Sequence, residues 1–486
     1  MMGEKEKDNS KLYYYGFSLS ERIPRDHPLR VIKKAIDFKF VYKEVKDKYG
    51  RKGNVSVPPP IILKMMFLLF FYNVSSEREL MRTIPLRLDW LWFLGYDIDH
   101  EVPHHSVLSK ARKRWGKELF YKFFVQIVEQ CVECGLVDGD KLFADSTLVD
   151  ANASIDSVVN KESSKRYLNE RYRELEEKLE EKEDKYVSTT DPDSGYVKHG
   201  RTKAKPRYKE HRGVDGRFGV ITASIVSSGT VDDGAMFKPL VDMHEDTTKI
   251  KVETGVGDSK YGIADNYLIC KEKGIKPHFE DLKSTQVKGG KRRGIFSSDK
   301  FEYDEETDTF ICPAGKRLTR RSHDIKRKRV KYVSCKEDCD ICPFRSECTK
   351  SKSGVRTVDR LERQRDVDEM RQEAKSQSSK RDLKKRWHLM EGSFADGENQ
   401  HNLKKARWRG YWRVQIQEWM ISAVQNIRIL IKHTYLDVES GQMAMKKPEK
   451  GKLRPVNLYL IFILVKIWSF FRKKQNILKY VGSTCL

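Results

Sequence analysis

Residues 141–145 are Lys-Leu-Phe-Ala-Asp, a short apolar run that ends in an acid. Such a run predicts a buried β-strand with Asp145 at its end. Further strand-like runs follow at 208–214, 218–227 and 250–258. Helical spacing is expected around 236–244 and over 266–273, and a short strand over 276–279.

The order of these elements predicts an α/β fold. Successive strands without an intervening helix pair antiparallel, whereas strands separated by a helix pair in parallel. The expected order is strand, strand, strand, helix, strand, helix, strand, which fits a mixed sheet with helices on its faces. Helices are expected to resume near Lys380, and the clearest lies over 411–431, where apolar residues share one face.

Most of residues 12–138 are expected to be helical. Three prolines at 58–60 open an apolar run over 61–72, which predicts a buried helix. Ser76 and Glu79 have the spacing of a capping box, so a second helix is expected to start there. Cys131 and Cys134 lie one turn apart in an apolar helix and are expected in its core.

The charge of the chain points to its partner. The 486 residues are too many for one compact core, so two or three domains are expected. Lys and Arg number 95 against 71 Asp and Glu, a net charge of +24. This excess predicts a polyanion partner, because each phosphate that Lys or Arg neutralises releases counterions. One basic cluster is expected either to contact DNA or to be an ordinary solvated face: Lys110, Arg112, Lys113 and Arg114.

The two ends of the chain bear on its location. Residues 1–11 are charged and have no apolar run, so no secretory signal is expected. The apolar stretch 458–471 is short and is interrupted by Lys466 and Ser469, so we expect no spanning helix and no membrane partner. A cytoplasmic, nucleoid-associated protein is the expectation.

Two aspartates are candidates for phosphodiester chemistry. Cutting or joining a phosphodiester requires neutralised phosphate charge and an activated hydroxyl, which two Mg²⁺ ions about 3.5–4 Å apart can provide. Mg²⁺ needs oxygen ligands, so such sites use carboxylates. Asp145 and Asp258 each end an expected strand, and the small residues before Asp258 leave room for metal and DNA. With 71 acidic residues, an Asp-Asp-Glu triple has little weight alone.

Five motifs in a fixed order carry more weight. They are FADSTLVDAN (143–152), YKEH (208–211), VDDG (231–234), GDSKYG (257–262) and EGSFAD (391–396), the last followed by ARWRG (406–410). They resemble the motifs of bacterial insertion-sequence DDE transposases. Residues 13–138, with SEREL at 76–80, resemble the helical domain that precedes the core in that family, so the resemblance covers 13–435.

The resemblance implies an RNase H-like mixed sheet flanked by helices, an all-α N-terminal domain and a cysteine-bearing insertion. It makes Asp145, Asp258 and Glu391 the catalytic residues and the ligands of two Mg²⁺ or Mn²⁺ ions. The implied activity is DNA cleavage and strand transfer of an insertion sequence. The implied partners are double-stranded DNA, as terminal inverted repeats and target, and a second copy of the chain.

The resemblance also divides the chain. The expected parts are 1–138 for the helical DNA-binding domain, 139–284 for the first part of the core with a charged helical insertion at about 155–206, 285–375 for the basic cysteine-rich insertion, 376–435 for the second part of the core with the glutamate, and 436–486 for a basic and apolar tail.

Around the glutamate, the chain departs from its relatives. Where many of them carry a tyrosine, an arginine and a lysine, this chain has Lys384, Trp387 and Glu398. The DNA contacts expected near the glutamate are therefore assigned to other basic residues: Arg386, Lys404, Lys405, Arg407 and Arg409.

Three further residues are weighed as parts of the site. Glu398 lies two turns from Glu391 on the same helix face and is its reserve. Asp150 is the reserve for Asp145, although five residues along a strand put it on the opposite face. His211 is expected to be a structural histidine rather than a metal neighbour.

The sequence also contains a cluster of five cysteines: Cys312, Cys335, Cys339, Cys342 and Cys348. In a chain without an export signal, thiolates at short spacing favour a structural Zn²⁺ site over disulfides. Five candidates for four positions leave the ligand set open, and a cluster of reduced thiols is the alternative.

Two other functions remain open. A metal-dependent DNA nuclease without strand transfer would use the same carboxylates, and inverted repeats beside the coding sequence would favour the transposase over it. The other is an inactive, DNA-binding transposase remnant. The three acids argue against lost activity, whereas the unusual apolar tail keeps this alternative open.

Overall fold

The computed structural model describes residues 18–50, 55–160, 185–280, 294–326 and 328–434. Most of the expected charged helix, residues 161–184, and the apolar tail lie outside these ranges. Among the described helices, none combines the length and the apolar character needed to cross a membrane.

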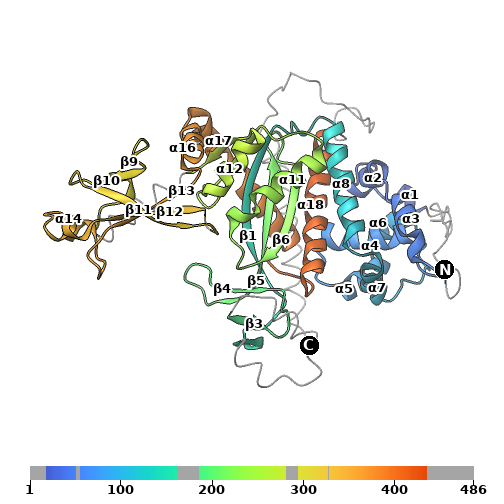
Figure 1. Cartoon of the computed structure of the whole chain (residues 1–486). Coiled ribbons are helices and arrows are strands. Elements are labelled where there is room, and N and C mark those ends of the chain that lie inside the picture. Colours follow the sequence, from blue (N-terminus) through green and yellow to red (C-terminus); the bar gives the residue numbers. More distant parts are fainter. Residues whose placement is uncertain (1–17, 51–54, 161–184, 281–293, 327, 435–486) are drawn as a thin grey trace, which may run out of the picture. The chain divides into compact units, whose positions relative to one another are not determined.

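The main sheet is mixed and six-stranded, in the order β4-β5-β1-β7-β8, with β6 paired to β5. Its strands β1, β4, β5 and β6 are labelled in Figure 1. β1 pairs antiparallel with β5 and parallel with β7, which in turn pairs parallel with β8. The mixed α/β sheet expected from the element order is thus confirmed. Its strands are β1 Lys141–Asp150, β4 Gly195–Val197, β5 Lys205–Asp215, β6 Ile221–Ser228, β7 Thr254–Gly257 and β8 Lys276–Phe279.

Helices cover both faces of this sheet, and alternation along β1 sends its side chains to each face in turn. Leu142 and Ala144 join one apolar cluster with residues of α11 Phe237–Thr248 and α12 Ala264–Lys273. Phe143 joins the cluster on the opposite face. That face is covered by α17 Gln377–His401 and α18 Tyr411–Thr434, and α8 Lys117–Glu133 packs on α18, beside which it lies in Figure 1.

The first strand is longer than its apolar run suggested. β1 stays paired with β5 from Leu142, opposite Asp215, to Asp150, opposite Arg207. Asp145 therefore lies in the middle of the strand, and its expected place at the strand end was wrong. The run ended at Asp145 because polar side chains begin there, but backbone pairing with β5 does not depend on them.

The N-terminal region is helical, as expected. α4 Pro59–Phe71 is buried along nearly its whole length, because it packs between other N-terminal helices and α18. Ser76 caps α5 Glu77–Thr83 by accepting a hydrogen bond from the backbone of Glu79 at 3.2 Å. Cys131 and Cys134 are buried in or beside α8, as predicted. The other α-helices of this region are α1 Leu19–Arg22, α2 Pro28–Ala35, α3 Phe40–Val45, α6 Leu88–Leu94 and α7 Ser106–Trp115.

The cysteine-bearing segment forms a second, five-stranded antiparallel sheet that the sequence did not predict. Most side chains of β11 are exposed, so the strand lacks the apolar alternation by which a strand is recognised. A small apolar cluster, including Phe310 and Tyr332, supports this sheet. α16 Gln364–Glu373 follows it and packs on α12. The strands are β9 Glu302–Asp304, β10 Thr309–Ile311, β11 Arg317–Asp324, β12 Arg329–Ser334 and β13 Thr357–Leu361.

Candidate active site

The parallel pairing of β1 and β7 brings two predicted acids together. Phe143 lies opposite Val256 in the ladder, and two residues further along come Asp145 and Asp258. Burial raises the pKa of Asp145, and the nearby Asp258 carboxylate raises it further. Two carboxylates held this close repel each other, so the pair attracts a cation.

The cation next to Asp145 in the structure is the guanidinium of Arg386. Its Nη1 donates to Oδ2 of Asp145 at 2.6 Å, and both side chains are mostly buried. The backbone N–H of Ser146 donates to the other carboxylate oxygen at 2.8 Å. Arg386 thereby offsets part of the rise in the pKa of Asp145. Although expected to contact DNA, Arg386 contacts the acid itself.

The third predicted acid lies apart from the first two. Glu391 follows Arg386 by five residues on α17, which is about 7.5 Å along the helix and about 140° around it. Its side chain is exposed, and within the described residues it forms no hydrogen bond or ion pair with Asp145 or Asp258. In the same part of the chain, no group of three or more His, Cys, Asp or Glu side chains is arranged to hold a metal ion.

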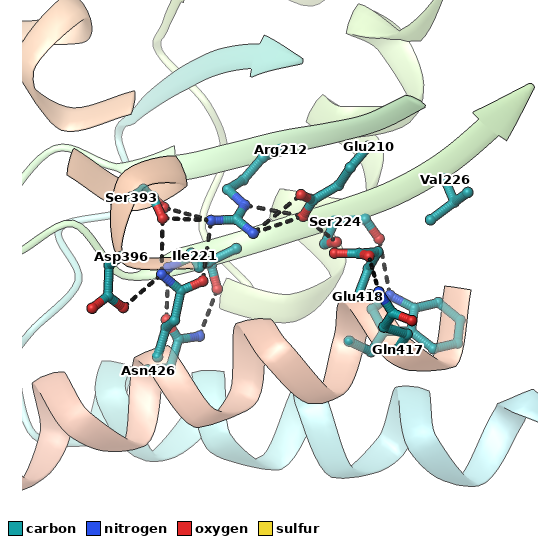
Figure 2. Close-up of polar contacts among 12 residues, drawn as sticks. Glu210, Arg212, Ile221, Ser224, Val226, Ser393, Asp396, Gln417, Glu418 and Asn426 are labelled. Atoms are coloured by element: carbon teal, nitrogen blue, oxygen red, sulfur yellow. Dashed lines mark hydrogen bonds and ion pairs between the residues drawn. The ribbon is translucent and has the colours of Figure 1, made fainter. Parts of the chain in front are cut away.

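The rotation of α17 is fixed by a buried arginine on β5, drawn in Figure 2. Arg212 lies directly opposite Asp145 in the antiparallel ladder and is fully buried. Its guanidinium pairs with Glu210 at 2.9 Å and donates to the hydroxyl of Ser393 at 2.8 Å. Ser393 is two residues beyond Glu391, so this contact anchors the helix turn that carries the predicted third acid.

Polar side chains of α18 cover the outer edge of β6 (Figure 2). The amide group of Asn426 accepts from the backbone N–H of Ile221 at 2.8 Å and donates to its carbonyl at 2.7 Å. Gln415 does the same with the N–H of Val226 and the carbonyl of Ser224. The helix therefore satisfies backbone groups that an edge strand otherwise leaves unpaired.

A buried acid on the same helix completes this polar layer. Glu418 is fully buried, and burial, followed by the charge of Glu210, raises its pKa well above the usual range. The sequence predicted α18 only as an apolar core helix. Its polar residues at buried positions were the signal that could have indicated contacts with β6. These are Gln415, Gln417, Glu418, Ser422, Gln425 and Asn426.

A further buried acid, Asp233, lies in the turn after β6 and pairs with two lysines. Its carboxylate accepts from Lys260 at 2.6 Å and lies 2.9 Å from the ammonium of Lys209. Burial alone would raise the pKa of Asp233, but the hydrogen bonds from both lysines outweigh burial and lower it. His211, on β5, hydrogen-bonds Ser227 at 2.8 Å, and burial lowers its pKa to about 3. A neutral, buried imidazole in such a bond has the features of a structural histidine.

Both reserve acids pair with basic groups. Arg207 donates to Asp150 at 2.9 Å, and Lys205 also contacts this carboxylate. Burial alone would raise the pKa of Asp150, but these hydrogen bonds lower it. Glu398 forms an ion pair with Lys404 at 2.6 Å.

The basic residues predicted to contact DNA fall into two groups. Arg112 is only 4% exposed, pairs with Glu77 and stacks on Trp408 at 3.9 Å. Arg407 donates to Asn73 at 2.8 Å and to a neighbouring backbone carbonyl. These two arginines hold the N-terminal helices to the segment after α17. The exposed group comprises Lys110, Lys113, Arg114, Lys404, Lys405 and Arg409.

The five clustered cysteines near the second sheet also fall into two groups. Cys312, Cys339, Cys342 and Cys348 line one small cavity. Cys335 is exposed and hydrogen-bonds Glu337 instead. All the described cysteines are free thiols.

Two family models match the chain. A transposase domain (DUF772) matches residues 17–114, in the helical N-terminal region. A transposase DDE domain matches residues 311–431, from β10 through α17 to α18, a range that includes Glu391 and the clustered cysteines. No curated protein matches the chain.

Proposed function

We propose that this chain, which belongs to the DDE transposases of insertion sequences, cleaves and joins DNA strands at an RNase H-like core with two divalent metal ions. The observation that carries the proposal is the adjacency of Asp145 and Asp258 on neighbouring parallel strands, under the helix that bears Glu391. Carboxylates that meet on one sheet are the ligands that such chemistry requires.

The two aspartates fit a divalent cation by their chemistry. They already attract one cation, the Arg386 side chain, and a metal ion would offset the same repulsion. Bound Mg²⁺ or Mn²⁺ supplies phosphate neutralisation and hydroxyl activation. For Glu391 to join the aspartates, Arg386 would have to release Asp145, and the helix turn of Glu391 would have to move toward them against the anchor that Arg212 provides. Asp145 and Asp258 would hold the metal ions beside the phosphate, and Glu391 would add a further negative charge to balance them.

The DNA partner is proposed on charge and family. Exposed Lys110, Lys113 and Arg114 near the C-terminal end of α7 would contact the terminal inverted repeats. Lys405 and Arg409, after α17, would contact DNA nearer the acids. Because transposition joins two element ends to target DNA, we propose that two copies of the chain act together.

For the second sheet, we propose a structural zinc ion held by Cys312, Cys339, Cys342 and Cys348. Four thiols around one cavity match the tetrahedral preference of Zn²⁺. They do not converge on one point in the structure, so binding would draw them together. Cys335 is left out because it faces Glu337.

The test of the function is a strand-transfer assay with full-length protein, Mg²⁺ and DNA that carries the ends of the element. Cleavage and joining by the wild type, and neither by Asp258→Asn, are expected. Cleavage without joining would favour the nuclease. DNA binding without either activity would favour the inactive remnant.

A further inference from the structure

A basic cleft of about 430 Å³ lies close to the paired aspartates, although neither of them lines it. Ser146, which follows Asp145, and Lys260, which lies two residues after Asp258, both line it. From there the cleft follows the outer half of β1 as far as Asp150. The rest of its lining is Thr147, Leu148, Val197, Lys198, His199, Arg207, Lys209, Gly229 and Lys404.

The lining of this cleft is basic. Among the described residues, five Lys and Arg side chains line it, against one carboxylate, that of Asp150, although Asp233 and Glu398 nearby also pair with three of the lysines. The Asp150 carboxylate is shared by Arg207 and Lys205, so it carries no surplus negative charge. Lys198 has no ion-pair partner among the described residues.

Several of these cations are held in place. Asp233 fixes Lys209 and Lys260 at one end of the cleft, and Asp150 fixes Arg207 at the other. The backbone of Lys404 accepts from the N–H of Asp150 at 2.8 Å, which ties the segment after α17 to the cleft. A site whose donors are positioned in advance loses less entropy when a ligand binds.

The lining also indicates which part of a nucleic acid fits. Among the described residues that line the cleft there is no Phe, Tyr or Trp; His199 is the one aromatic ring, and the apolar side chains are Leu148 and Val197. Cationic donors with so little surface for base stacking suit phosphate oxygens and do not distinguish bases.

We infer that this cleft binds the sugar-phosphate backbone of one DNA strand and leads its reacting phosphate to Asp145 and Asp258. The inference rests on the proposed function and names residues for it: Lys198, Arg207, Lys209, Lys260 and Lys404.

The test measures binding alone. Full-length protein is titrated against a labelled DNA duplex, without divalent metal, at several salt concentrations, and log Kd is plotted against log salt. The double variant Lys198→Ala, Lys404→Ala is expected to bind more weakly and to lower the slope by about 1–2, because each phosphate contact contributes about 0.9. Lys198→Arg should keep the wild-type slope.

The matched control is Lys251→Ala, an exposed lysine that precedes β7, at the end of the strand opposite Asp258. It should bind as the wild type does. A double variant with unchanged affinity and slope would overturn the cleft assignment, even if the chain cleaves DNA. A reduced slope in a chain that never cleaves would support the cleft and refute the proposed function.

Discussion

Arg386 of α17 donates to Asp145 of β1 at 2.6 Å, so the first predicted metal ligand is already neutralised by a side chain of the helix that carries Glu391. A metal ion and this guanidinium would compete for the same carboxylate. Loss of the arginine should therefore have opposite effects on the stability of the free protein and on its response to metal.

Arg386→Gln is expected to lower the free energy of unfolding by about 1–3 kcal/mol, because a mostly buried carboxylate loses its charged partner. Added Mg²⁺ should then raise the melting temperature more in this variant than in the wild type. Thermal unfolding with and without Mg²⁺ measures both effects. Lys384→Gln, at an exposed position on the same helix, is the control. Equal Mg²⁺ responses in Arg386→Gln and wild type would show that no metal replaces the arginine.

Asp145→Asn, Asp258→Asn and Glu391→Gln should each reduce Mg²⁺-dependent strand cleavage by at least about 10²–10⁴-fold, because each removes a negative charge that metal binding needs. DNA affinity should stay near that of the wild type. Asp150→Asn and Glu398→Gln are the controls and should keep most cleavage at saturating DNA, because these acids pair with basic residues of the cleft and are not proposed metal ligands. An inactive control beside an active neighbouring candidate would move the ligand to the reserve residue.

The zinc site predicts different outcomes for two cysteines of one cluster. Cys342→Ser should lose most bound zinc, whereas Cys335→Ser should retain it, because Cys342 lines the cavity and Cys335 does not. Elemental analysis of the purified variants measures the metal content. Less than about half an equivalent of zinc in the wild type, with its thiols freely reactive, would leave only a cluster of reduced thiols.

Substitutions in the basic cluster of α7 should separate effects on DNA binding from effects on folding. Alanine at Lys110, Lys113 and Arg114 together should weaken binding to the terminal repeats in a gel-shift series and leave the melting temperature unchanged, because these side chains are exposed. Arg112→Ala should instead destabilise the fold by about 3 kcal/mol, since the mostly buried Glu77 would be left without a partner. If the triple variant binds repeats like the wild type, the cluster is an ordinary solvated face.

Glu418 makes stability depend on pH. Its raised folded-state pKa means that the folded protein keeps a proton which the unfolded chain releases above its usual pKa of about 4.3. Stability from this group is therefore present at low pH and is lost as pH rises above that value. Glu418→Gln should be more stabilising at pH 8 than at pH 5 in urea unfolding. A variant that is equally affected at both pH values would mean that Glu418 ionises normally in the fold.

The sequence predicted the elements that have a regular apolar pattern. The order of strands and helices in the main sheet, the buried α4 and the cap at Ser76 follow from local periodicity and spacing. The closeness of Asp145 and Asp258 follows from parallel pairing of their strands. The elements and the cap are consequences of short-range chemistry, whereas the closeness of the two aspartates also requires two strands that are distant in the chain to pair.

What the sequence could not predict depends on contacts between distant segments. The rotation of α17 depends on the bond between Arg212 and Ser393, which are 181 residues apart. The burial of Arg112 depends on Trp408 from the far end of the chain. Charge and spacing alone do not distinguish such an arginine from one that faces DNA.

The cover that α18 places on β6 also determines when this protein can fold. Gln415 and Asn426 are among the last described residues of the chain, yet they complete the edge of a strand made some 200 residues earlier. On the ribosome, β6 must therefore wait with an open edge and an uncovered apolar face until α18 emerges. A chain that stops before Tyr411 would keep that edge and face exposed, and both promote aggregation. Emergence of α18 thus acts as a folding checkpoint for this sheet.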